Sequence, residues 1–208
     1  MNLGLGNLIE LKRQLLSAGQ LAEATYDTLI TGIGQGVAGM FDQFCNRAFE
    51  RKVAEVEEFS ADRRYWCLRR FPLESITAVE QRDDMVGGWV GLVINDVIVQ
   101  RDDKAGLIKF GAMQGTHLSQ VRIEYTGGYW FDTTEDGSGV KPGGATDLPK
   151  DVKLAWYLQC REVWNKIDRV GLALLKGEGD KTFVAQMLQG LEMVPAVKDT
   201  LNTYRRFA

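Results

Sequence analysis

A glycine motif is the feature of this sequence that comes nearest to a recognisable chemical site. Residues 34–39 spell G-x-G-x-x-G, and three glutamates follow about twenty residues later: Glu55, Glu57 and Glu58. In a dinucleotide-binding fold, glycines at this spacing end a strand, admit a pyrophosphate and begin a helix. Here residues 22–33 have helical spacing instead, and the residues after the glutamates alternate like antiparallel strands. A nucleotide-binding enzyme is therefore a remote alternative.

The same glycines have a second interpretation as a packing surface. In a helix, Gly32, Gly36 and Gly39 form a stripe of small residues on one face. Each glycine costs up to about 1 kcal/mol relative to alanine in a helix, and close approach of a neighbouring helix or subunit would compensate for that cost. We therefore predict that Gly32, Gly36 and Gly39 pack against another subunit.

Other candidates for catalysis or metal binding are sparse. The chain has one histidine, His117, in the turn-like stretch 115–117, so a site built from several histidines is excluded. Cys45, Cys67 and Cys160 are far apart and lack C-x-x-C spacing, as expected for buried thiols in a reducing compartment. We expect no catalytic residue, cofactor or metal, and therefore no enzyme.

An acidic, glycine-rich stretch at residues 132–147 begins like a calcium-binding loop. Its third position is Thr134, and its twelfth position, which needs a bidentate glutamate, is Gly143. The stretch is also longer than most connections within a compact domain. We expect a flexible, solvated loop rather than a calcium site.

Composition excludes several classes of partner. The chain of 208 residues has a formal net charge of -3 and a pI near 5.3, so it has no global attraction to nucleic acid or to an anionic membrane. No apolar run reaches the roughly 18 residues that a membrane span needs. Residues 1–6 have no basic region of a signal peptide, and we expect synthesis in a cytoplasm.

The tryptophans do not form a pattern typical of single-strand nucleic-acid binding. Such proteins combine stacking aromatic side chains with a positively charged groove. The five tryptophans are spread over segments with both helical and strand periodicity: Trp66, Trp89, Trp130, Trp156 and Trp164. We expect them to serve core or interface packing, without interleaved arginines.

Two segments have the three-and-four spacing of helices. The first, at 8–50, breaks at Ala18-Gly19 and then continues from about residue 21 as one long apolar stripe. The second begins after Leu148, where Pro149 suits the first helical turn and Asp151 complements the helix dipole. Its stripe reaches residue 174, and a further short helix is expected at 183–191.

Between these segments, the period changes to two. Short apolar alternations recur from residue 53 to residue 130, separated by Asp, Asn and Gly clusters. This pattern predicts an antiparallel sheet or a small sandwich. The expected fold is α+β, with a mainly helical body (long N-terminal and C-terminal helices) and an inserted antiparallel β subdomain. The body is assigned to 1–52 and 148–208, the insert to 53–131 and the flexible loop to 132–147.

Several short sequences, taken in order, resemble one protein family. They are Tyr26-Asp27-Thr28-Leu29, Asn46-Arg47-Ala48-Phe49, residues 70–76 (RFPLESI), residues 125–129 (YTGGY), residues 148–153 (LPKDVK) and residues 204–206 (YRR). In this order the chain resembles the head-tail connector (adaptor) proteins of tailed bacteriophages, whose relatives occur in prophages and gene transfer agents. One departure is the glycine-rich stretch 32–39, where relatives more often carry alanines.

The resemblance implies a structural virion protein of the neck, made in the bacterial host cytoplasm. It implies a homo-oligomeric ring, usually of twelve copies, docked beneath the portal protein. DNA passes through the ring without sequence-specific binding, and the lower face is a platform for the next neck or tail protein. Another neck or tail-completion protein, of the stopper or terminator type, is an alternative.

In the resembled family, the C-terminal segment reaches into grooves of the portal. The corresponding candidates for portal contact in this chain are Pro195, Val197, Leu201, Tyr204, Arg205, Arg206 and Phe207. Leu201, Tyr204 and Phe207 would be apolar anchors, and the two arginines would make charge-assisted contacts. The alternative is an amphipathic terminal helix that folds back on its own core.

Overall fold

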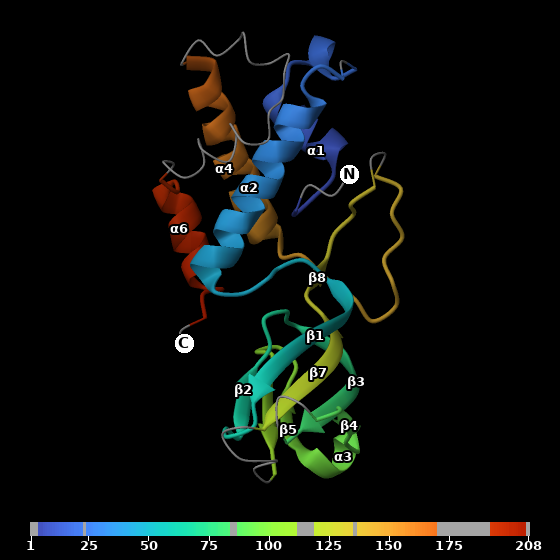
Figure 1. The fold of residues 1–208 in the computed structure, drawn as a ribbon. Coiled ribbons are helices and arrows are strands. Elements are labelled where there is room, and N and C mark those ends of the chain that lie inside the picture. The colour runs from blue at the N-terminus through green and yellow to red at the C-terminus, as the bar shows by residue number, and fades with distance from the viewer. Residues whose placement is uncertain are drawn as a thin grey trace. The chain divides into compact units, whose positions relative to one another are not determined.

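The computed structural model divides the chain into two compact units (Figure 1). It describes residues 4–22, 24–83, 87–111, 119–134, 137–169 and 192–206. The helical unit comprises Met1–Arg47, Phe131–Pro142 and Asp147–Ala208. The β unit comprises Ala48–Trp130 and Gly143–Thr146. Each unit has its own core.

Four α-helices and one 3-10 turn make up the described part of the helical unit: α1 (Leu8–Leu15), η1 (Ala18–Gln20), α2 (Asp27–Cys45), α4 (Lys150–Arg169) and α6 (Pro195–Asn202). The helix α1 begins at a capping asparagine, because Asn7 Oδ1 accepts a hydrogen bond from Glu10 N at 2.8 Å. The helix α2 ends where Asn46 adopts a left-handed conformation with φ 51°. None of the described helices is long and apolar enough to cross a membrane.

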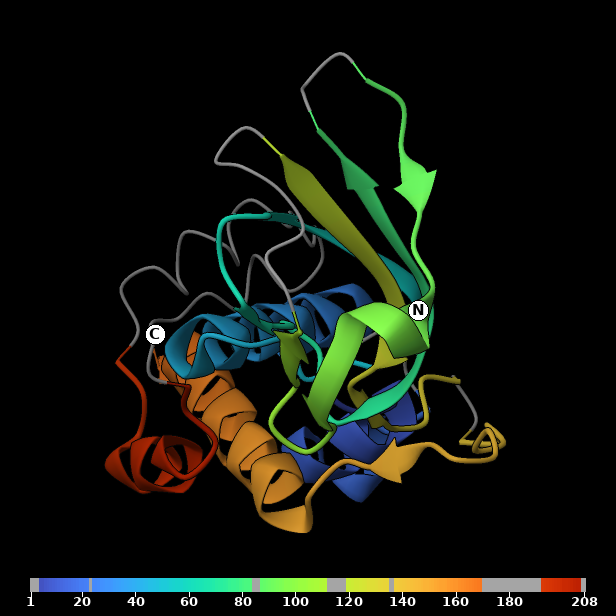
Figure 2. The ribbon, with the colours of Figure 1, turned by 90° about the horizontal axis from the view of Figure 1, so that it is seen from below.

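The core of the helical unit lies between α2 and α4, and α6 packs against both helices (Figure 2). The fully buried apolar side chains of α2 recur at three- and four-residue spacing: Ile30, Ile33, Val37, Phe41 and Cys45. They face a matching stripe on α4: Val152, Trp156, Cys160 and Val163. Trp156 is fully buried and its Nε1 donates a hydrogen bond to Gly34 O at 3.1 Å. Its polar atom is thus satisfied inside the core.

The strands pair antiparallel in two main sheets of the β unit. The first has the order β1-β7-β3-β4, with bounds Lys52–Ser60, Gln120–Gly127, Leu73–Arg82 and Val90–Gly91. The second has the order β2-β6-β5, with bounds Tyr65–Cys67, Leu107–Phe110 and Ile98–Asp102. A short helix, α3 (Ile94–Val97), precedes β5, and β8 (Tyr129–Trp130) pairs with β9 (Thr146–Asp147).

The inner residues of both sheets form one hydrophobic cluster. Alternate residues of β7, namely Val121, Ile123 and Tyr125, are fully buried, and the residues between them are half-buried. Trp66 and Phe110 meet in a T-shaped pair with ring centroids 4.2 Å apart. The Tyr125 hydroxyl donates to Glu57 and accepts a hydrogen bond from Arg70 N, and burial raises the pKa of the phenol.

The Gly127-Gly128 pair joins three segments of the β unit. A Cβ at Gly127 would lie 2.6 Å from Arg70 O, and a Cβ at Gly128 would lie 2.5 Å from Glu50 O. Gly128 also has φ +98°, which disfavours other residues. Its N–H donates to Pro72 O, and the next residue, Tyr129, donates to Phe49 O. The glycines in Tyr-Thr-Gly-Gly-Tyr therefore permit backbone segments to approach closely.

The prediction of a mainly helical body with long terminal helices is wrong. The first and last described helices, α1 and α6, have eight residues each, and the fold is a sheet-rich α+β fold with nine strands among the described residues. The stripe from about residue 21 is helical only from Asp27, after a turn, and it ends at Cys45. The second helical stripe forms α4, and its expected continuation from residue 170 to residue 174 lies outside the described residues, as does the short helix expected at 183–191. The assigned domain boundaries stay a prediction.

Stability is expected to fall as pH rises above 9, in part because of Cys45. Burial raises the pKa of this thiol from 9.0 to about 12. Between those values the unfolded chain releases a proton that the folded chain keeps, so rising pH favours unfolding. One proton contributes about 1.4 kcal/mol per pH unit to this slope. Below pH 9, both states hold the proton and the contribution is constant.

The measurement is the free energy of unfolding in urea from pH 8.5 to 10.5, compared between the wild type and Cys45→Ala. Buried Cys160 also has a raised pKa, but it is present in both proteins and its contribution cancels in the difference. The variant is expected to lose stability less steeply. Parallel pH profiles would show that Cys45 titrates normally.

Candidate assembly surfaces

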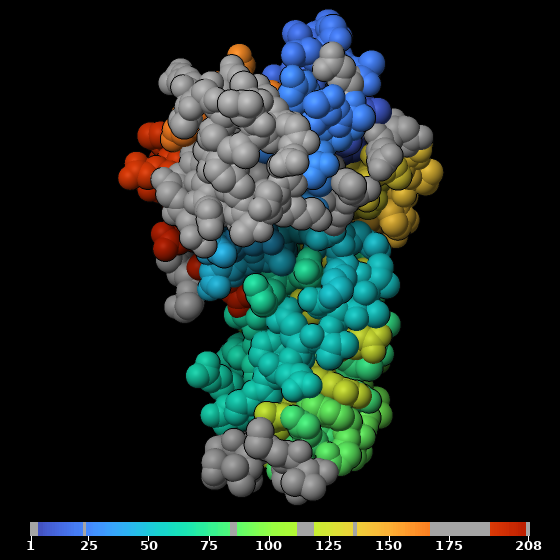
Figure 3. All heavy atoms as spheres, turned by 45° about the horizontal axis from the view of Figure 1, so that its top comes forward, coloured from blue at the N-terminus to red at the C-terminus, as the bar shows by residue number. Residues whose placement is uncertain are grey.

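The helix α6 is attached to the helical unit by buried contacts. Val197 and Leu201 are both fully buried, and Cys45 Sγ donates to Leu201 O at 3.6 Å. Pro195, Lys198 and other polar or small residues of α6 remain exposed, and the helix lies at the surface in Figure 3. The helix is therefore amphipathic, with its apolar side in the core of the unit.

A buried glutamine fixes the start of α6. The Gln159 side chain is fully buried on α4. Its Oε1 accepts a hydrogen bond from Val194 N at 2.9 Å, and its Nε2 donates to Glu192 O at 3.5 Å. Pro195 then occupies the first turn of α6, where a missing N–H costs nothing. Since a buried amide without partners is costly, Gln159 ties the chain entering α6 to α4.

Residues 203–206, which follow α6 and are called the strap below, make more exposed contacts. The Tyr204 hydroxyl lies 2.8 Å from both carboxylate oxygens of Asp151. The Arg205 guanidinium lies 5.2 Å from the Phe44 ring centroid, within cation–π range. Arg206 N donates to Cys45 O at 2.9 Å. The strap thus lies against the first turn of α4 and the last turn of α2.

The structure places the predicted portal-contact residues in two groups. Val197 and Leu201 are buried in their own unit, as in the alternative of a terminal helix folded onto its core. Pro195 and Arg205 are exposed, and Tyr204 and Arg206 are half-buried. Phe207 lies outside the described residues. Portal contact by this segment stays a prediction. Because Val197 and Leu201 are buried, the strap is the better candidate for that contact.

The predicted glycine stripe lies on α2. Gly32 and Gly36 are half-buried and Gly39 is exposed, with no heavy atom of a neighbouring residue within 4 Å of a Cβ built there. Their packing against another subunit stays a prediction. Sequence reasoning missed Gly34, the buried glycine of this helix, whose carbonyl accepts the Trp156 indole N–H.

The position of the G-x-G-x-x-G motif weighs against a nucleotide site. Residues 34–39 lie in the middle of α2, eight or more residues from the N-cap at Tyr26. A phosphate-binding glycine loop precedes a helix, because it is the free N–H groups of the first turn that bind the phosphate. Within α2 these N–H groups lie inside the helix. Saturable ATP or NAD binding is therefore not expected.

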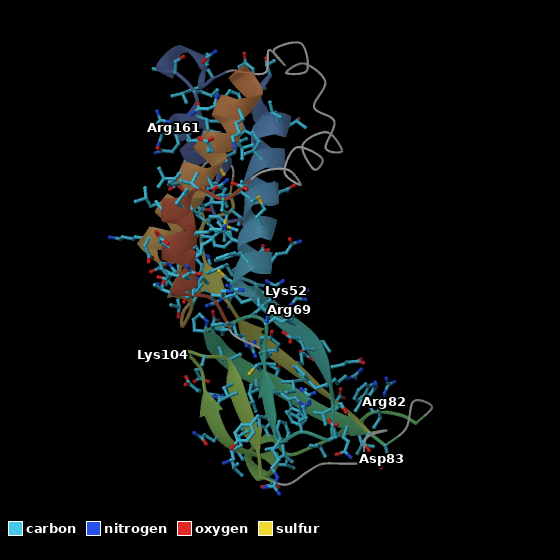
Figure 4. The ribbon with its side chains drawn as sticks, turned by 90° about the vertical axis from the view of Figure 1, so that its left-hand side faces the viewer. Lys52, Arg69, Arg82, Asp83, Lys104 and Arg161 are labelled. Carbon is cyan, nitrogen blue, oxygen red and sulfur yellow. The ribbon has the colours of Figure 1, made fainter. Side chains whose placement is uncertain are left out.

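One tryptophan does interact with arginines, contrary to the expectation from sequence. The Arg82 and Arg122 guanidiniums each lie 4.6 Å from the Trp89 ring centroid. The arginines are further held by neighbouring strands, since Arg122 pairs with Glu80 and Arg82 Nε donates to Gln120 at 2.7 Å. Figure 4 labels Arg82 at the end of β3. Finding this arginine–tryptophan cluster requires the register between β3 and β7, which the sequence alone does not give.

Asp132 organises the described start of the loop at 132–147. Asp132 accepts hydrogen bonds from Thr134 N, Thr134 Oγ1 and Gly139 N at 2.9, 2.6 and 3.0 Å. These bonds form a small turn in which the carboxylate replaces backbone acceptors. Among the described residues, no group of three or more His, Cys, Asp or Glu side chains is placed to hold a metal ion.

The helical unit also has a hollow of about 510 Å³ beside α1 and the start of α2. Its described lining is mainly apolar: Leu8, Ile9, Lys12, Arg13, Leu21, Ala22 and Asp27. Lys12 Nζ lies 2.7 Å from Asp27 Oδ1.

Comparisons with known proteins give results only at the level of structure. No protein-family model matches the sequence, and no curated protein matches it either. A chain in the solved structure "Neck of empty GTA particle computed with C6 symmetry" has a TM-score of 0.58 and 14% identity, over 97% of this chain and 89% of that chain. A chain in "Virion of native gene transfer agent (GTA) particle" has a TM-score of 0.59 and 13% identity, over 97% and 89%.

At this low identity, the comparison concerns the fold. Both correspondences span both units, so they cover the combination of helices and antiparallel sheets and not one common motif. They confirm, at the level of the fold, the resemblance that the short sequences indicated. The chain has the fold of chains found in the neck and virion structures of gene transfer agents.

Proposed function

We propose that this chain is a structural protein of the virion neck, a head-tail adaptor that docks as a ring beneath the portal. The observation that carries the proposal is the fold correspondence over 97% of the chain to a chain in a gene transfer agent neck structure. The sequence resemblance supports it independently, because the YTGGY and LPKDVK stretches occur in the order found in adaptor proteins.

The strap is the surface that we assign to portal binding. The buried contacts of α6 leave the strap as the part of the described C-terminal segment that can leave the unit without opening its core. The strap carries one aromatic residue and two arginines: Tyr204, Arg205 and Arg206. Tyrosine and arginine are enriched at interface hot spots, and a guanidinium makes strong, directional bonds to carboxylates. A portal groove with apolar walls and acidic rims would suit it.

Three further features complete the proposed role: passage of DNA through the ring, the number of copies, and a platform for the next protein. The net charge of -3 gives the chain no general affinity for DNA, as a channel wall that DNA must pass requires. Twelve copies in the virion, and a platform for the next neck or tail protein, are carried over from the adaptor resemblance.

Truncation after Thr203 is expected to reduce portal affinity at least about tenfold, since it removes four candidate contact side chains and leaves α6 intact: Tyr204, Arg205, Arg206 and Phe207. The double variant Arg205→Ala/Arg206→Ala should show a smaller loss of the same kind. The measurement is sedimentation of fluorescent protein with purified portal, with circular dichroism to verify folding.

The matched control is Arg161→Ala, which removes one exposed positive charge from α4 (Figure 4), and it should bind like the wild type. Equal portal binding by the truncated chain would contradict the role of the strap. Binding to a later neck protein, with no binding to portal, would favour the stopper or terminator alternative.

A further inference from the structure

The C-terminal segment contains a boundary between two kinds of attachment. Up to Asn202, the chain is fixed by the buried side chains of Val197 and Leu201 and by the buried Gln159 amide. From residue 203 onward, the contacts with α2 and α4 given above are a phenol–carboxylate hydrogen bond, a cation–π contact and one backbone hydrogen bond. Contacts near solvent break more easily than core packing does, so the strap can detach while α6 remains in place.

The Tyr204–Asp151 contact is the strongest of these strap contacts. The acceptor is a carboxylate, and both of its oxygens lie 2.8 Å from the phenol oxygen. Hydrogen bonds to ionised acceptors are stronger than those between neutral groups. Asp151 stands in the first turn of α4. The acceptor is thus fixed to a helix of the core, and the donor lies in the strap.

We propose that the Tyr204–Asp151 hydrogen bond is a latch that keeps the strap on the helical unit and opens when a partner takes the strap. The latch is a property of the isolated chain; only the identity of the partner, the portal, rests on the proposed function. When most chains are latched, the apparent affinity for the partner equals the affinity of the open form multiplied by the fraction of chains that are open. The latch therefore delays docking, because the bond from the Tyr204 hydroxyl to Asp151 must break before the Tyr204 ring and the two arginines can meet the partner.

Trypsin provides a direct test, because it cleaves after Arg205 and Arg206. Cleavage of a segment that opens quickly follows the population of the open state. Tyr204→Phe keeps the ring and removes the hydroxyl, and it should accelerate release of the C-terminal fragment by about threefold to tenfold, the effect of losing one hydrogen bond of ordinary net strength near solvent. Asp151→Ala should accelerate it similarly. The double variant should be no faster than the faster single variant, since both remove the same interaction.

The matched control is Tyr157→Phe, which removes the hydroxyl that donates to Glu10 Oε2 at 3.0 Å elsewhere in the helical unit. It should release the fragment at the wild-type rate. An unchanged rate in Tyr204→Phe, or equal acceleration in Tyr157→Phe, would overturn the latch.

Portal binding then tests the second half of the proposal. Tyr204→Phe should associate with portal about threefold faster than the wild type, whereas loss of the arginines weakens binding. Slower association of Tyr204→Phe would overturn the release step. If the wild type does not bind portal, the proposed function fails, and the trypsin rates still decide the latch.

Discussion

Trp156→Ala is expected to destabilise the helical unit by about 3–5 kcal/mol, the usual cost of truncating a buried tryptophan. The side chain is fully buried between α2 and α4, and the substitution leaves Gly34 O without its indole donor. The N-terminal segment adds to the effect, because a Cβ at Gly6 would lie 2.9 Å from the Trp156 ring. That segment packs directly on the ring and would lose its support.

The measurement is the urea dependence of the far-ultraviolet circular dichroism of both proteins. The control is Leu158→Ala, a truncation on the same helix at a side chain that is 44% exposed, which should cost less than about 1 kcal/mol. A loss below about 1 kcal/mol for Trp156→Ala would show that the α2–α4 contact does not hold the unit together.

Gly128→Ala is expected to destabilise the β unit by about 2 kcal/mol or more. The backbone conformation, with φ +98°, alone costs a residue with a Cβ about 1–3 kcal/mol. The Cβ would also meet backbone, Glu50 O at 2.5 Å, which cannot move aside as a flexible side chain would. Relief of that contact would displace the paired segments at Glu50 and Tyr129.

Unfolding should be followed by tryptophan fluorescence, because Trp66 lies in the core of the β unit. The comparison is Gly88→Ala, where no neighbouring heavy atom lies within 4 Å of the added Cβ, and its stability should change by less than about 0.5 kcal/mol. Equal stability of the two variants would contradict the role assigned to the YTGGY junction.

Some elements of the structure were predictable because a single local pattern determines them. The strand Leu107–Phe110 coincides with the expected alternation, and α4 begins at Lys150, one residue after the Pro149 that was expected in its first turn. The burial of Cys45 and Cys160 also follows from their residue type, whereas Cys67, which was expected to be buried as well, is half-buried. In each case, sequence neighbours carry the whole signal.

Other elements depended on contacts between distant residues. The stripe from residue 21 continues through a turn before Asp27, because apolar spacing does not record where backbone hydrogen bonds begin. The helix α3 was missed, since four residues carry too little periodicity. The overall balance was also misjudged, because the length of a helical stripe overstated the helix that it forms and short strands were given too little weight.

The candidate site was only partly accessible from sequence. The C-terminal residues were identified from resemblance, but spacing alone assigned Leu201 and Tyr204 to one surface. The structure separates them, since Leu201 is buried against the core and Tyr204 lies on Asp151. The Arg82–Trp89–Arg122 cluster required the register of β3 with β7, in which Glu80 faces Arg122.

The assignment to a virion neck is tested most directly by electron microscopy of the purified protein mixed with its portal. We predict a ring of this chain stacked coaxially on one end of the portal, with density for the strap at the contact. Portal particles that remain bare at saturating protein concentration, while the chain is folded by circular dichroism, would contradict the assignment.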